Sequence, residues 1–464
     1  MALIPMEEDE QSITIEGEEK MVPSTGGNPI WRNAYFLKPL INPTNRPLPR
    51  PPSVSPPSDP SILKKLTKRV DFKGSQKPPE KWKTWVRDLE ETHHNVWKKV
   101  GIFDAIKAST YKILRHNELI VALADKWCPE TNTFIFPWGE CTVTLEDVMI
   151  LGGFPVLGRS VICYSERREF EEIVSELLTA CFEIKAKCSH FVTHNGWMNH
   201  FKGKGGELEH VALLVLWLSR YVFSANIFFR INQDVFDIAI RLANGIKVAL
   251  APAVLALIYR DLGLLKKYFA TFTCKRRGRS PGLVLLAPFQ LVQLWAWERF
   301  PCLSPKPNSL MFVEPRLAQW HSVKKLEIEA LREELEAAGD HFLWRPYAFN
   351  SKNWDLPKFY GDKERWLLAN SEVEDELLSF ARCLRACELV AVDCLEQYCP
   401  HRVAMQFGMD QDIPDSHPRS LAWSSMTNRS TVGGSICLIG WRREVSLIST
   451  RIGGRKHSLL MIKC

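Results

Sequence analysis

Cysteine and histidine residues gather in one stretch of this chain, and they are the first candidates for chemistry. The group consists of Cys181, Cys188, His190, His194 and His200. Thiolate and imidazole are ligands that zinc prefers, and His190 and His194 would share one face of a helix. A structural zinc site normally pairs cysteines separated by only a few residues, whereas Cys181 and Cys188 are farther apart. The spacing therefore favours ordinary surface and core residues, and we expect no metal site.

A second group of cysteines is a weaker metal candidate. It consists of Cys383, Cys387, Cys394, Cys399 and His401. Three of these cysteines fall in the segment 372–395, whose pattern predicts a helix. Free cysteines on such a helix behave as small buried hydrophobic residues. We therefore expect no metal ligand in this group either.

Phosphate-binding and nucleophile motifs are incomplete in this chain. The segment 203–206 (GKGG) lacks the full spacing of a P-loop, and the segment 433–437 (GGSIC) lacks the closing glycine of a nucleophile elbow. No lysine stands in a recognisable pyridoxal phosphate setting. We expect no catalytic residue, no cofactor-binding residue and no cofactor, and hence a protein that is not an enzyme. A transferase or nuclease is the least favoured alternative.

Aromatic side chains are abundant, and four tryptophans lie near two arginines in sequence. They are Trp295, Trp297, Trp344 and Trp354, with Arg299 and Arg345. Such groups can stack on nucleic-acid bases or form a cage for a modified side chain. Tryptophans at helical spacing beside a Glu-Arg pair are more often part of a core and its rim. We favour the core interpretation.

Two short basic runs are candidates for nuclear import or phosphate contact. They are Lys64-Lys65 with Lys68-Arg69, and Lys275-Arg276-Arg277 with Arg279. Short basic loops are commonly just solvated, so these runs permit contact with nucleic acid without requiring it. The formal net charge of +7 leads to the same conclusion, because 60 basic and 53 acidic residues largely offset one another.

Secondary structure is most clearly predicted by the sequence in the stretch 127–158. A β-branched and aromatic run at 133–136 is followed by a turn at Trp138-Gly139 and a returning strand at 141–144. The stretch therefore predicts a β-hairpin. It supplies a scaffold and no catalytic geometry.

A short helix should follow the hairpin. The Thr144 hydroxyl can accept a hydrogen bond from the backbone N–H near Asp147 and so cap the first turn. Glu146 and Asp147 suit the positive end of a helix, and Gly152-Gly153 should end it. We therefore predict a helix that begins after Thr144.

Helical periodicity dominates the rest of the chain. Trp82, Trp85, Val86 and Leu89 stand at i, i+3, i+4 and i+7, and the segment 113–127 shows a similar pattern. Further helices are predicted at 167–186, 208–223, 233–243, 246–262, 283–298, 322–338 and 372–395. The charges in 322–338 indicate a solvated helix packed on a larger body. The expected fold is mainly α: a large helical domain with a small β-hairpin insertion and an extended Pro-rich N-terminal strap.

Length and composition fit a protein with a large core. The chain has 464 residues, of which 45% are hydrophobic, and its 13 cysteines show no regular spacing. Since the first residues lack a signal peptide, we expect reduced thiols and a cytosolic or nuclear protein. The apolar stretches 210–229 and 248–259 are expected to be buried helices and not membrane spans. The first contains Arg220 and leads to Arg230, and the second is too short.

Both ends of the chain differ in composition from its centre. Residues 1–60 are first acidic and then Pro-rich, which predicts a largely disordered tail and linker. Residues 61–427 form the predicted helical domain, and residues 428–464 form a divergent basic tail. Within that tail, 436–439 and 445–448 have strand-like apolar runs that would form a hairpin if the tail were native. We favour a mobile tail instead.

Several motifs resemble a known family. They are the hairpin stretch with Trp127, 129–131, 133–134, 139–140, 142–148, 151–152, Pro155 and Gly158, then 253–262, 294–301 (LWAWERFP), 344–347 (WRPY) and 401–408 (HRVAMQFG). In this order they are similar to the plant mobile domain family of MAIN and MAIN-like proteins, often labelled aminotransferase-like. The resemblance covers roughly residues 26–420.

The resemblance implies more about biology than about chemistry. It implies a non-enzymatic nuclear protein, related to transposon-encoded proteins, that acts as an interaction module in gene silencing, genome stability and meristem maintenance. It also implies a partner of the plant phosphatase 7 long-form type, a Ser/Thr phosphatase. The phosphatase's own metal-binding motifs are absent from this sequence. Direct binding of nucleic acid or chromatin, inherited from a transposon ancestor, is the alternative, and we expect no membrane partner.

Overall fold

The computed structural model describes most of the chain. It describes residues 14–21, 30–37, 60–74, 77–162, 170–188, 191–224, 229–274, 282–328, 330–349, 353–354, 356–360, 375–411, 448–452 and 455–459. The chain divides into two units. Unit 1 comprises Met1–Pro52, Pro357–Ala386 and Cys399–Cys464, and unit 2 comprises Ser53–Leu356 and Cys387–Tyr398. The predicted boundaries at residues 60 and 428 stay predictions.

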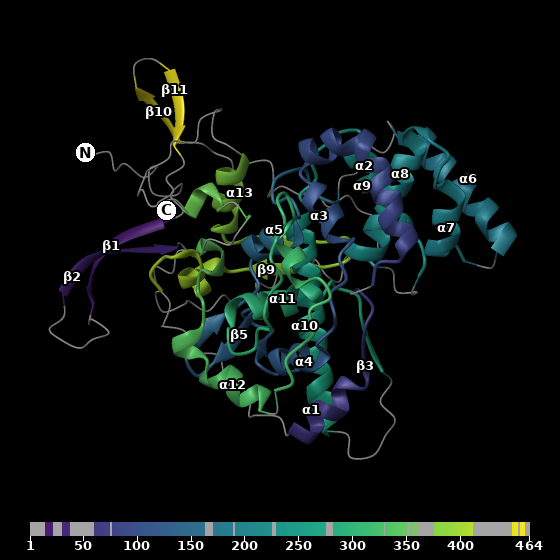
Figure 1. Ribbon diagram of the computed structural model, residues 1–464. Helices are drawn as coiled ribbons and strands as arrows, with labels where there is room; N and C mark the ends of the chain where they lie inside the picture. The colour runs from purple at the N-terminus through teal and green to yellow at the C-terminus, as the bar shows by residue number, and fades with distance from the viewer. Residues whose placement is uncertain are drawn as a thin grey trace. The chain divides into compact units, whose positions relative to one another are not determined.

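The α-helices of unit 2 contain far more of its described residues than its strands do (Figure 1). They are α1 (Pro60–Thr67), α2 (Glu80–Val100), α3 (Phe103–Ala108), α4 (Asn117–Asp125), α5 (Leu145–Gly152), α6 (Glu171–Cys188), α7 (His194–Phe201), α8 (Gly206–Trp217), α9 (Phe236–Ala243), α10 (Leu250–Cys274), α11 (Gln290–Arg299) and α12 (Leu331–Ala337). Short helical turns are η2 (Leu218–Val222, a π-helix), η3 (Gln233–Val235), η4 (Arg316–Trp320), η5 (Gly339–His341) and η6 (Pro346–Ala348).

The strands of unit 2 form only small sheets, so the fold is mainly α with small β-hairpin elements. They are β3 (Val70–Phe72), β4 (Trp127–Cys128), β5 (Thr133–Phe136), β6 (Gly139–Cys141), β7 (Leu283–Leu285), β8 (Cys387–Val390) and β9 (Leu395–Tyr398). The sheet orders are β4-β5-β6, β3-β7 and β8-β9. Only the β3-β7 pair is parallel among them.

The hairpin predicted from the sequence is confirmed, with two differences. Phe136 pairs with Gly139, so Pro137 and Trp138 make the turn instead of Trp138 and Gly139. The returning strand ends at Cys141, and β4 adds a third strand on the other side of β5. The predicted cap is also confirmed: the Thr144 hydroxyl accepts from Asp147 N–H, and Gly153 ends the helix with φ of 68°.

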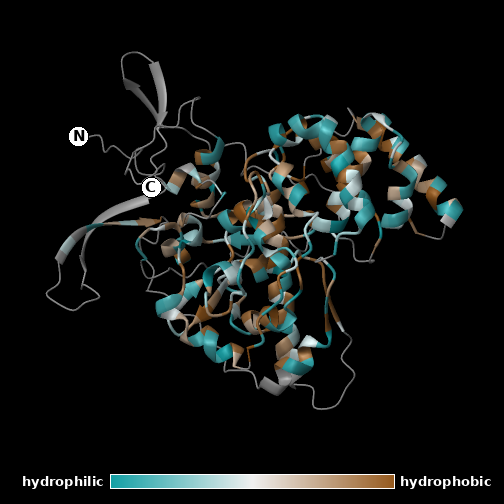
Figure 2. Cartoon of the chain, in the orientation of Figure 1, coloured by the Kyte–Doolittle hydropathy of each residue, from teal (hydrophilic) through white to brown (hydrophobic). Residues whose placement is uncertain are grey.

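The apolar stretches that the sequence assigns to the core are buried helices. The helix α8 continues into η2, and every residue from Glu209 to Val222 is buried. Around it lie α2, α7 and α9, while α10 packs against α4 and α5 (Figure 1). Many helices carry hydrophobic and hydrophilic residues together, as expected for amphipathic helices on a core (Figure 2). Within the described part of the chain, no helix combines the length and apolar character needed to cross a bilayer.

Three predicted helices are wrong in part. Residues 283–285 form strand β7, which pairs with β3 at a distant place in the sequence. Of the segment 322–338, only Leu331–Ala337 is α-helical, because long-range bonds hold its start in another conformation: Ser322 N–H donates to Lys112 O at 2.7 Å, and φ of Ser322 is 56°. Of the described residues in 372–395, Asp375–Cys383 form helix α13, and the chain enters the β8-β9 hairpin at Cys387.

Unit 1 contains two hairpins and a few short helices. Its elements are β1 (Thr14–Met21), β2 (Ile30–Leu37), η7 (Lys358–Tyr360), α13, η8 (Pro400–Phe407), β10 (Ile448–Ile452) and β11 (Arg455–Leu459). Tyr35 and Asp410 join β2 to the segment after η8, since Tyr35 N–H donates to Asp410 Oδ2 and Asp410 N–H donates to Tyr35 O, each at 2.9 Å. The rings of Phe359 and Phe380 stack with centroids 4.2 Å apart.

The two chain ends contain strands within segments predicted to be tails. Strand β1 lies in the acidic segment and pairs with β2 in a register that places Glu19 opposite Arg32. At the other end, β10 pairs with β11. The apolar runs predicted as strands, 436–439 and 445–447, lie outside the described residues, as does the Pro-rich segment 38–59. Only Ile448 of the predicted strands lies in β10.

Candidate functional site

The motif residues Asp147, Arg299 and Tyr347 meet in a buried polar cluster. They come from α5, α11 and η6, and each is at most 1% exposed. Arg299 Nη2 and the Tyr347 hydroxyl both donate to Asp147 Oδ1 at 2.7 Å. The other carboxylate oxygen of Asp147 accepts from Thr144 N–H at 2.7 Å, which closes the capping box. One carboxylate thus ties three segments together.

The protonation states in this cluster are fixed by burial and by the neighbouring charges. Burial opposes the charge of Arg299, but the Asp147 carboxylate beside it raises the pKa of Arg299 above its ordinary value. Burial and Asp147 raise the pKa of Tyr347 well above its usual range, so the phenol keeps its proton and donates it. Both Asp147 oxygens and both Arg299 Nη atoms make internal hydrogen bonds, whereas Arg299 Nε has no partner among the described residues. A buried ion pair bonded in this way holds a geometry.

Glu298 forms a second buried cluster beside the first. Its carboxylate accepts from Arg316 Nη2 at 2.8 Å, from Gln319 Nε2 at 2.6 Å and from Trp320 Nε1 at 3.0 Å. The Arg316 guanidinium also lies over the rings of Tyr347 and Trp354, at 5.1 and 4.3 Å from their centroids. The two clusters therefore share Tyr347 as a spacer between two arginines.

The motif 253–262, which lies in α10, also supports the fold. The Tyr259 hydroxyl donates to Val143 O at 2.7 Å, and Asp261 Oδ2 accepts from the N–H groups of Leu286 and Ala287 at 2.8 Å each. Tyr259 and Asp261 are buried in α10. These side chains attach α10 to the hairpin and to the chain after β7, so they too support the fold.

The tryptophans are distributed as the core interpretation predicts. Trp295 and Trp297 are 0% and 2% exposed. Trp295 stacks on Phe134 with centroids 5.1 Å apart, and Trp297 contacts Trp320 at 5.2 Å. Trp344 and Trp354 are half-buried at the rim. Arg299 donates to the carbonyls of Leu343 and Trp344, so it is committed to the backbone as well as to Asp147.

The structure describes the side chains of three of the five candidate zinc residues, Cys181, His194 and His200. Helix α7 begins at His194, and residues 191–193 before it are not helical, so this helix does not extend back toward residue 190. His190 itself and the Cys188 side chain lie outside the described positions. His194 Nε2 lies 3.1 Å from Arg230 O, and its Nδ1 lies 3.3 Å from Arg220 Nη1. Nowhere in the described part do three potential ligands gather.

The second cysteine group is also divided between elements. Cys383 ends α13, Cys387 begins β8, and Cys394 precedes β9. The prediction that three of these cysteines share one helix is wrong, because the chain turns into a hairpin after Cys383. Burial raises the pKa of the Cys394 thiol to about 12, which keeps it protonated and unsuited to metal binding or attack.

The glycine loop 203–206 is occupied by a carboxylate of the protein itself. Gly203, Gly205 and Gly206 have positive φ, the conformation in which successive N–H groups form an anion-binding concavity. Glu209 fills it, accepting from the N–H groups of Gly203 and Gly205, and Trp85 Nε1 donates to the same carboxylate at 2.7 Å. This arrangement caps α8 from within and leaves no place for a phosphate.

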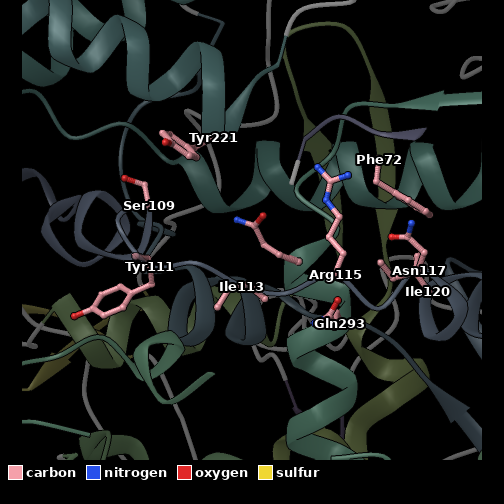
Figure 3. Close-up of a pocket in the computed structure, with 11 residues that line it drawn as sticks. Phe72, Ser109, Tyr111, Ile113, Arg115, Asn117, Ile120, Tyr221 and Gln293 are labelled. Atoms are coloured by element: carbon pink, nitrogen blue, oxygen red, sulfur yellow. The ribbon is translucent and has the colours of Figure 1, made fainter. Parts of the chain in front are cut away.

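A small polar cavity lies between α3, α4 and η2. Ser109, Tyr111 and Tyr221 lie at one end, and Arg115 and Asn117 at the other (Figure 3). Its volume of about 20 Å³ suffices for one water molecule and excludes a substrate. We expect a water molecule there, because it would satisfy buried polar atoms.

A larger groove opens beside η3 and α10. Its volume is about 360 Å³, and its lining combines apolar residues such as Leu257 and Leu286 with Arg230, Asp234 and Asp393. Arg260 crosses its floor, donating from Nη1 to Asp393 and from Nε to Asp261. The charges are mixed, and no nucleophile with an adjacent base is found among its described lining residues. The combination of apolar walls and a few charged groups is suited to binding.

Comparison with known families places these clusters in context. A family model described as Plant mobile domain matches residues 101–448. The chain belongs to the plant mobile domain family. All four residues at the centre of the buried clusters, Asp147, Glu298, Arg299 and Tyr347, lie within the matched range. The match ends inside the segment 428–464, which was predicted to depart from the family.

Relatives with curated names come from Arabidopsis thaliana. Protein MAINTENANCE OF MERISTEMS is 25% identical over 312 residues, which cover 65% of this chain and 59% of the relative. A "Serine/threonine-protein phosphatase 7 long form homolog" is 25% identical over 330 residues, which cover 64% of this chain and 22% of that protein. Protein MAIN-LIKE 1 is 25% identical over 322 residues, covering 64% of this chain and 55% of that protein. No solved structure gives a significant match.

Sequence reasoning identified Thr144 but missed the pairing around it. The signal available was Arg299 at the end of an apolar helix, since a charge there must find a partner. The identity of that partner was not readable, because Asp147 is far away in the chain. Arg220 was noticed only as an argument against a membrane span, although the structure buries it with no carboxylate partner among the described residues.

Proposed function

We propose that this chain is a non-enzymatic interaction module of the nucleus that acts in transcriptional silencing, genome stability and meristem maintenance. The observation that supports it is the use of the motif residues. Asp147, Glu298, Arg299 and Tyr347 are buried and committed to internal hydrogen bonds, so the polar residues of the motifs support a scaffold. What such a scaffold presents to other molecules is its surface.

The relatives give this proposal its biological direction. One relative is named for the maintenance of meristems, and the name of another denotes a serine/threonine phosphatase. The similar region makes up 22% of that phosphatase-named protein, so most of it lies outside the shared module. We propose that the partner of this chain is a phosphatase of the plant phosphatase 7 long-form type, so that the module and the phosphatase act together as separate chains.

Affinity purification of the full chain from plant nuclei tests the proposal. Quantitative mass spectrometry should recover a phosphatase of this type together with chromatin factors. A matched control is the Trp297→Ala chain, whose core defect should reduce recovery of all specific partners equally. A preparation from which both the phosphatase and the chromatin factors are absent would overturn the proposal.

Direct nucleic-acid binding is the second candidate, and one observation favours it. Lys64, Lys65, Lys68 and Arg69 are all exposed at the end of α1. The other basic run, 275–279, lies outside the described residues. If these side chains bind phosphates, affinity for DNA should fall steeply as salt is raised, because neutralised phosphates release counterions. Absence of a gel shift at low ionic strength would exclude this function.

A further inference from the structure

Two arginines of unit 2 lack a carboxylate partner within the described residues. Arg220 is 7% exposed, and its donors reach Tyr221 Oη at 3.1 Å, His194 Nδ1 at 3.3 Å and Lys77 O at 3.1 Å. All three acceptors are neutral. Arg230 is half-buried and forms no ion pair in the part of the chain that the structure describes. Buried cations are normally paired, so the buried Arg220 and the half-buried Arg230, which have no carboxylate partner among the described residues, leave a local positive potential.

A short antiparallel contact holds these arginines beside two phenylalanines. His194 N–H donates to Phe229 O at 2.7 Å, and Ile231 N–H donates to Val192 O at 2.9 Å. The Arg230 guanidinium lies 5.1 Å from the ring centroid of Phe191, and that of Arg220 lies 5.8 Å from the ring centroid of Phe229. We call Phe191, His194, Arg220, Phe229 and Arg230 the Arg–Phe cluster.

The Arg–Phe cluster has the composition of a protein-binding hot spot. Phe191 and Phe229 are 45% and 46% exposed, although large apolar rings gain free energy from burial. Aromatic residues and arginine are the types enriched at the centres of interfaces. Phe229 also has φ of 63°, a conformation that is unfavourable for a bulky residue and that commonly marks a functional position.

The groove beside α10 continues from the Arg–Phe cluster. Arg230 belongs to both, and Ile231, Leu257 and Leu286 give the groove apolar walls. Asp234 also lines the groove, and Asp393 is already paired with Arg260. A ligand that fits would place a negative group on Arg230 and an apolar side chain in the groove.

We propose that the Arg–Phe cluster and the adjoining groove bind an acidic segment of a partner protein in which carboxylates alternate with apolar side chains. A carboxylate pairs with Arg230, whose guanidinium is held in place by Phe191, so little side-chain entropy is lost on binding. Arg220 lies behind and adds positive potential. This inference rests on the proposed function, because it names the surface and the chemistry through which the module would bind.

The observations favour a protein segment over a nucleic-acid strand. A nucleic acid carries a phosphate at every nucleotide, and successive phosphates would lie against Asp234 and Asp393. Base stacking needs an open ring face, whereas a guanidinium already lies over each of Phe191 and Phe229. An isolated carboxylate avoids both difficulties.

Fluorescence anisotropy with the full chain tests the proposal. The probe is a labelled short peptide that alternates glutamate and leucine, and the control peptide has glutamine in place of glutamate. The wild-type chain should bind the glutamate peptide and not the glutamine peptide. Arg230→Gln should weaken binding about tenfold or more, and so should Phe191→Ser. Arg87→Gln, which changes an exposed arginine of α2, should have no effect.

Three outcomes would overturn the proposal. The first is equal affinity for the two peptides, and the second is equal affinity of the wild-type, Arg230→Gln and Arg87→Gln chains. The third is binding of an oligothymidylate that is lost in Arg230→Gln while the peptide does not bind, which would assign the surface to nucleic acid. If the nuclear partners still co-purify with an Arg230→Gln chain of unchanged fold, this inference fails but the proposed function stands.

Discussion

Arg299 and Arg316 lie in the same unit as Arg220 and Arg230, but their surroundings differ. Arg299 and Arg316 each face a buried carboxylate at 2.7 and 2.8 Å, respectively. Arg220 and Arg230 face neutral acceptors and aromatic rings. The first two therefore have their charge compensated within the protein, whereas the second two do not within the described residues.

The difference separates arginines that support the fold from arginines that can still bind a negatively charged partner. Arg299 belongs to the motif 294–301, and Arg316, which lies outside the motifs, pairs with Glu298 of that motif. Their ion pairs link α5 to α11 and α11 to η4. Arg230 is half-buried beside the exposed Phe191, Arg220 is buried with its guanidinium near Phe229, and both arginines lie outside those motifs. Recognition of the family therefore identifies a scaffold, and the function must be sought at positions that the motifs do not name.

The largest effect is expected where a compensated charge loses its partner. Glu298→Met should lower the free energy of unfolding by about 3–5 kcal/mol, because Arg316 is then buried without a carboxylate. Urea denaturation monitored by tryptophan fluorescence measures it. The double variant Glu298→Met with Arg316→Met should recover part of the loss, since it removes both charges. A single variant as stable as wild type would contradict the structural role of this pair.

Substitution of a buried aromatic residue next to the compensated pairs should also destabilise the fold. Trp297→Ala should cost on the order of 3–5 kcal/mol, because the indole is 2% exposed and packs on Trp320. Trp354→Ala, at the half-buried rim, should cost clearly less. Thermal melting compares the two, and equal shifts would mean that Trp297 is not part of a packed core.

A buried histidine should make stability fall at mildly acidic pH. Burial and then His93 lower the pKa of His210 to about 3, and His210 Nε2 accepts from Trp97 Nε1 at 2.8 Å, so the folded protein keeps this ring neutral. The unfolded chain protonates it near pH 6.5 and therefore binds more protons as pH falls. Between pH 7 and pH 5 the loss should be about 2 kcal/mol from this group.

Urea midpoints of the wild type and of His210→Gln, measured at both pH values, test this expectation. The variant should be less stable at pH 7 but show a smaller decrease toward pH 5. Identical pH dependence in the two proteins would show that His210 does not contribute to the loss of stability. Burial, and then the nearby Arg220, also lower the pKa of His194 to about 3. We expect the same pH dependence from His194.

The smallest of these effects concerns the helix cap that leads to Asp147. Thr144→Ala should cost about 1 kcal/mol, because Asp147 N–H loses its acceptor. Thr144→Ser keeps the hydroxyl and should cost less. Thermal denaturation distinguishes the two, and an unchanged melt for Thr144→Ala would show that the cap contributes nothing measurable.

Local features were predictable from the sequence, and the long-range ones were not. The hairpin and the Thr144 cap depend on neighbours a few residues away, so the sequence predicts them nearly in full. Strand β7 needs β3, and the start of 322–338 is held by Lys112, so periodicity alone assigned both to helices. The same limit applies to the site. Neighbouring residues in the sequence indicate neither the pairing of Asp147 with Arg299 nor the contact of Phe191 with Arg230.

The most direct test of the comparison makes one substitution at two places and measures the free energy of unfolding. Arg299→Met should lower it by about 3–5 kcal/mol, because Asp147 is left buried without its partner. Arg230→Met should change it by no more than about 0.5 kcal/mol, since that arginine has no carboxylate partner among the described residues and lies at the surface. Equal losses in the two variants, or a larger loss for Arg230→Met, would contradict the assignment of one arginine to the scaffold and the other to binding.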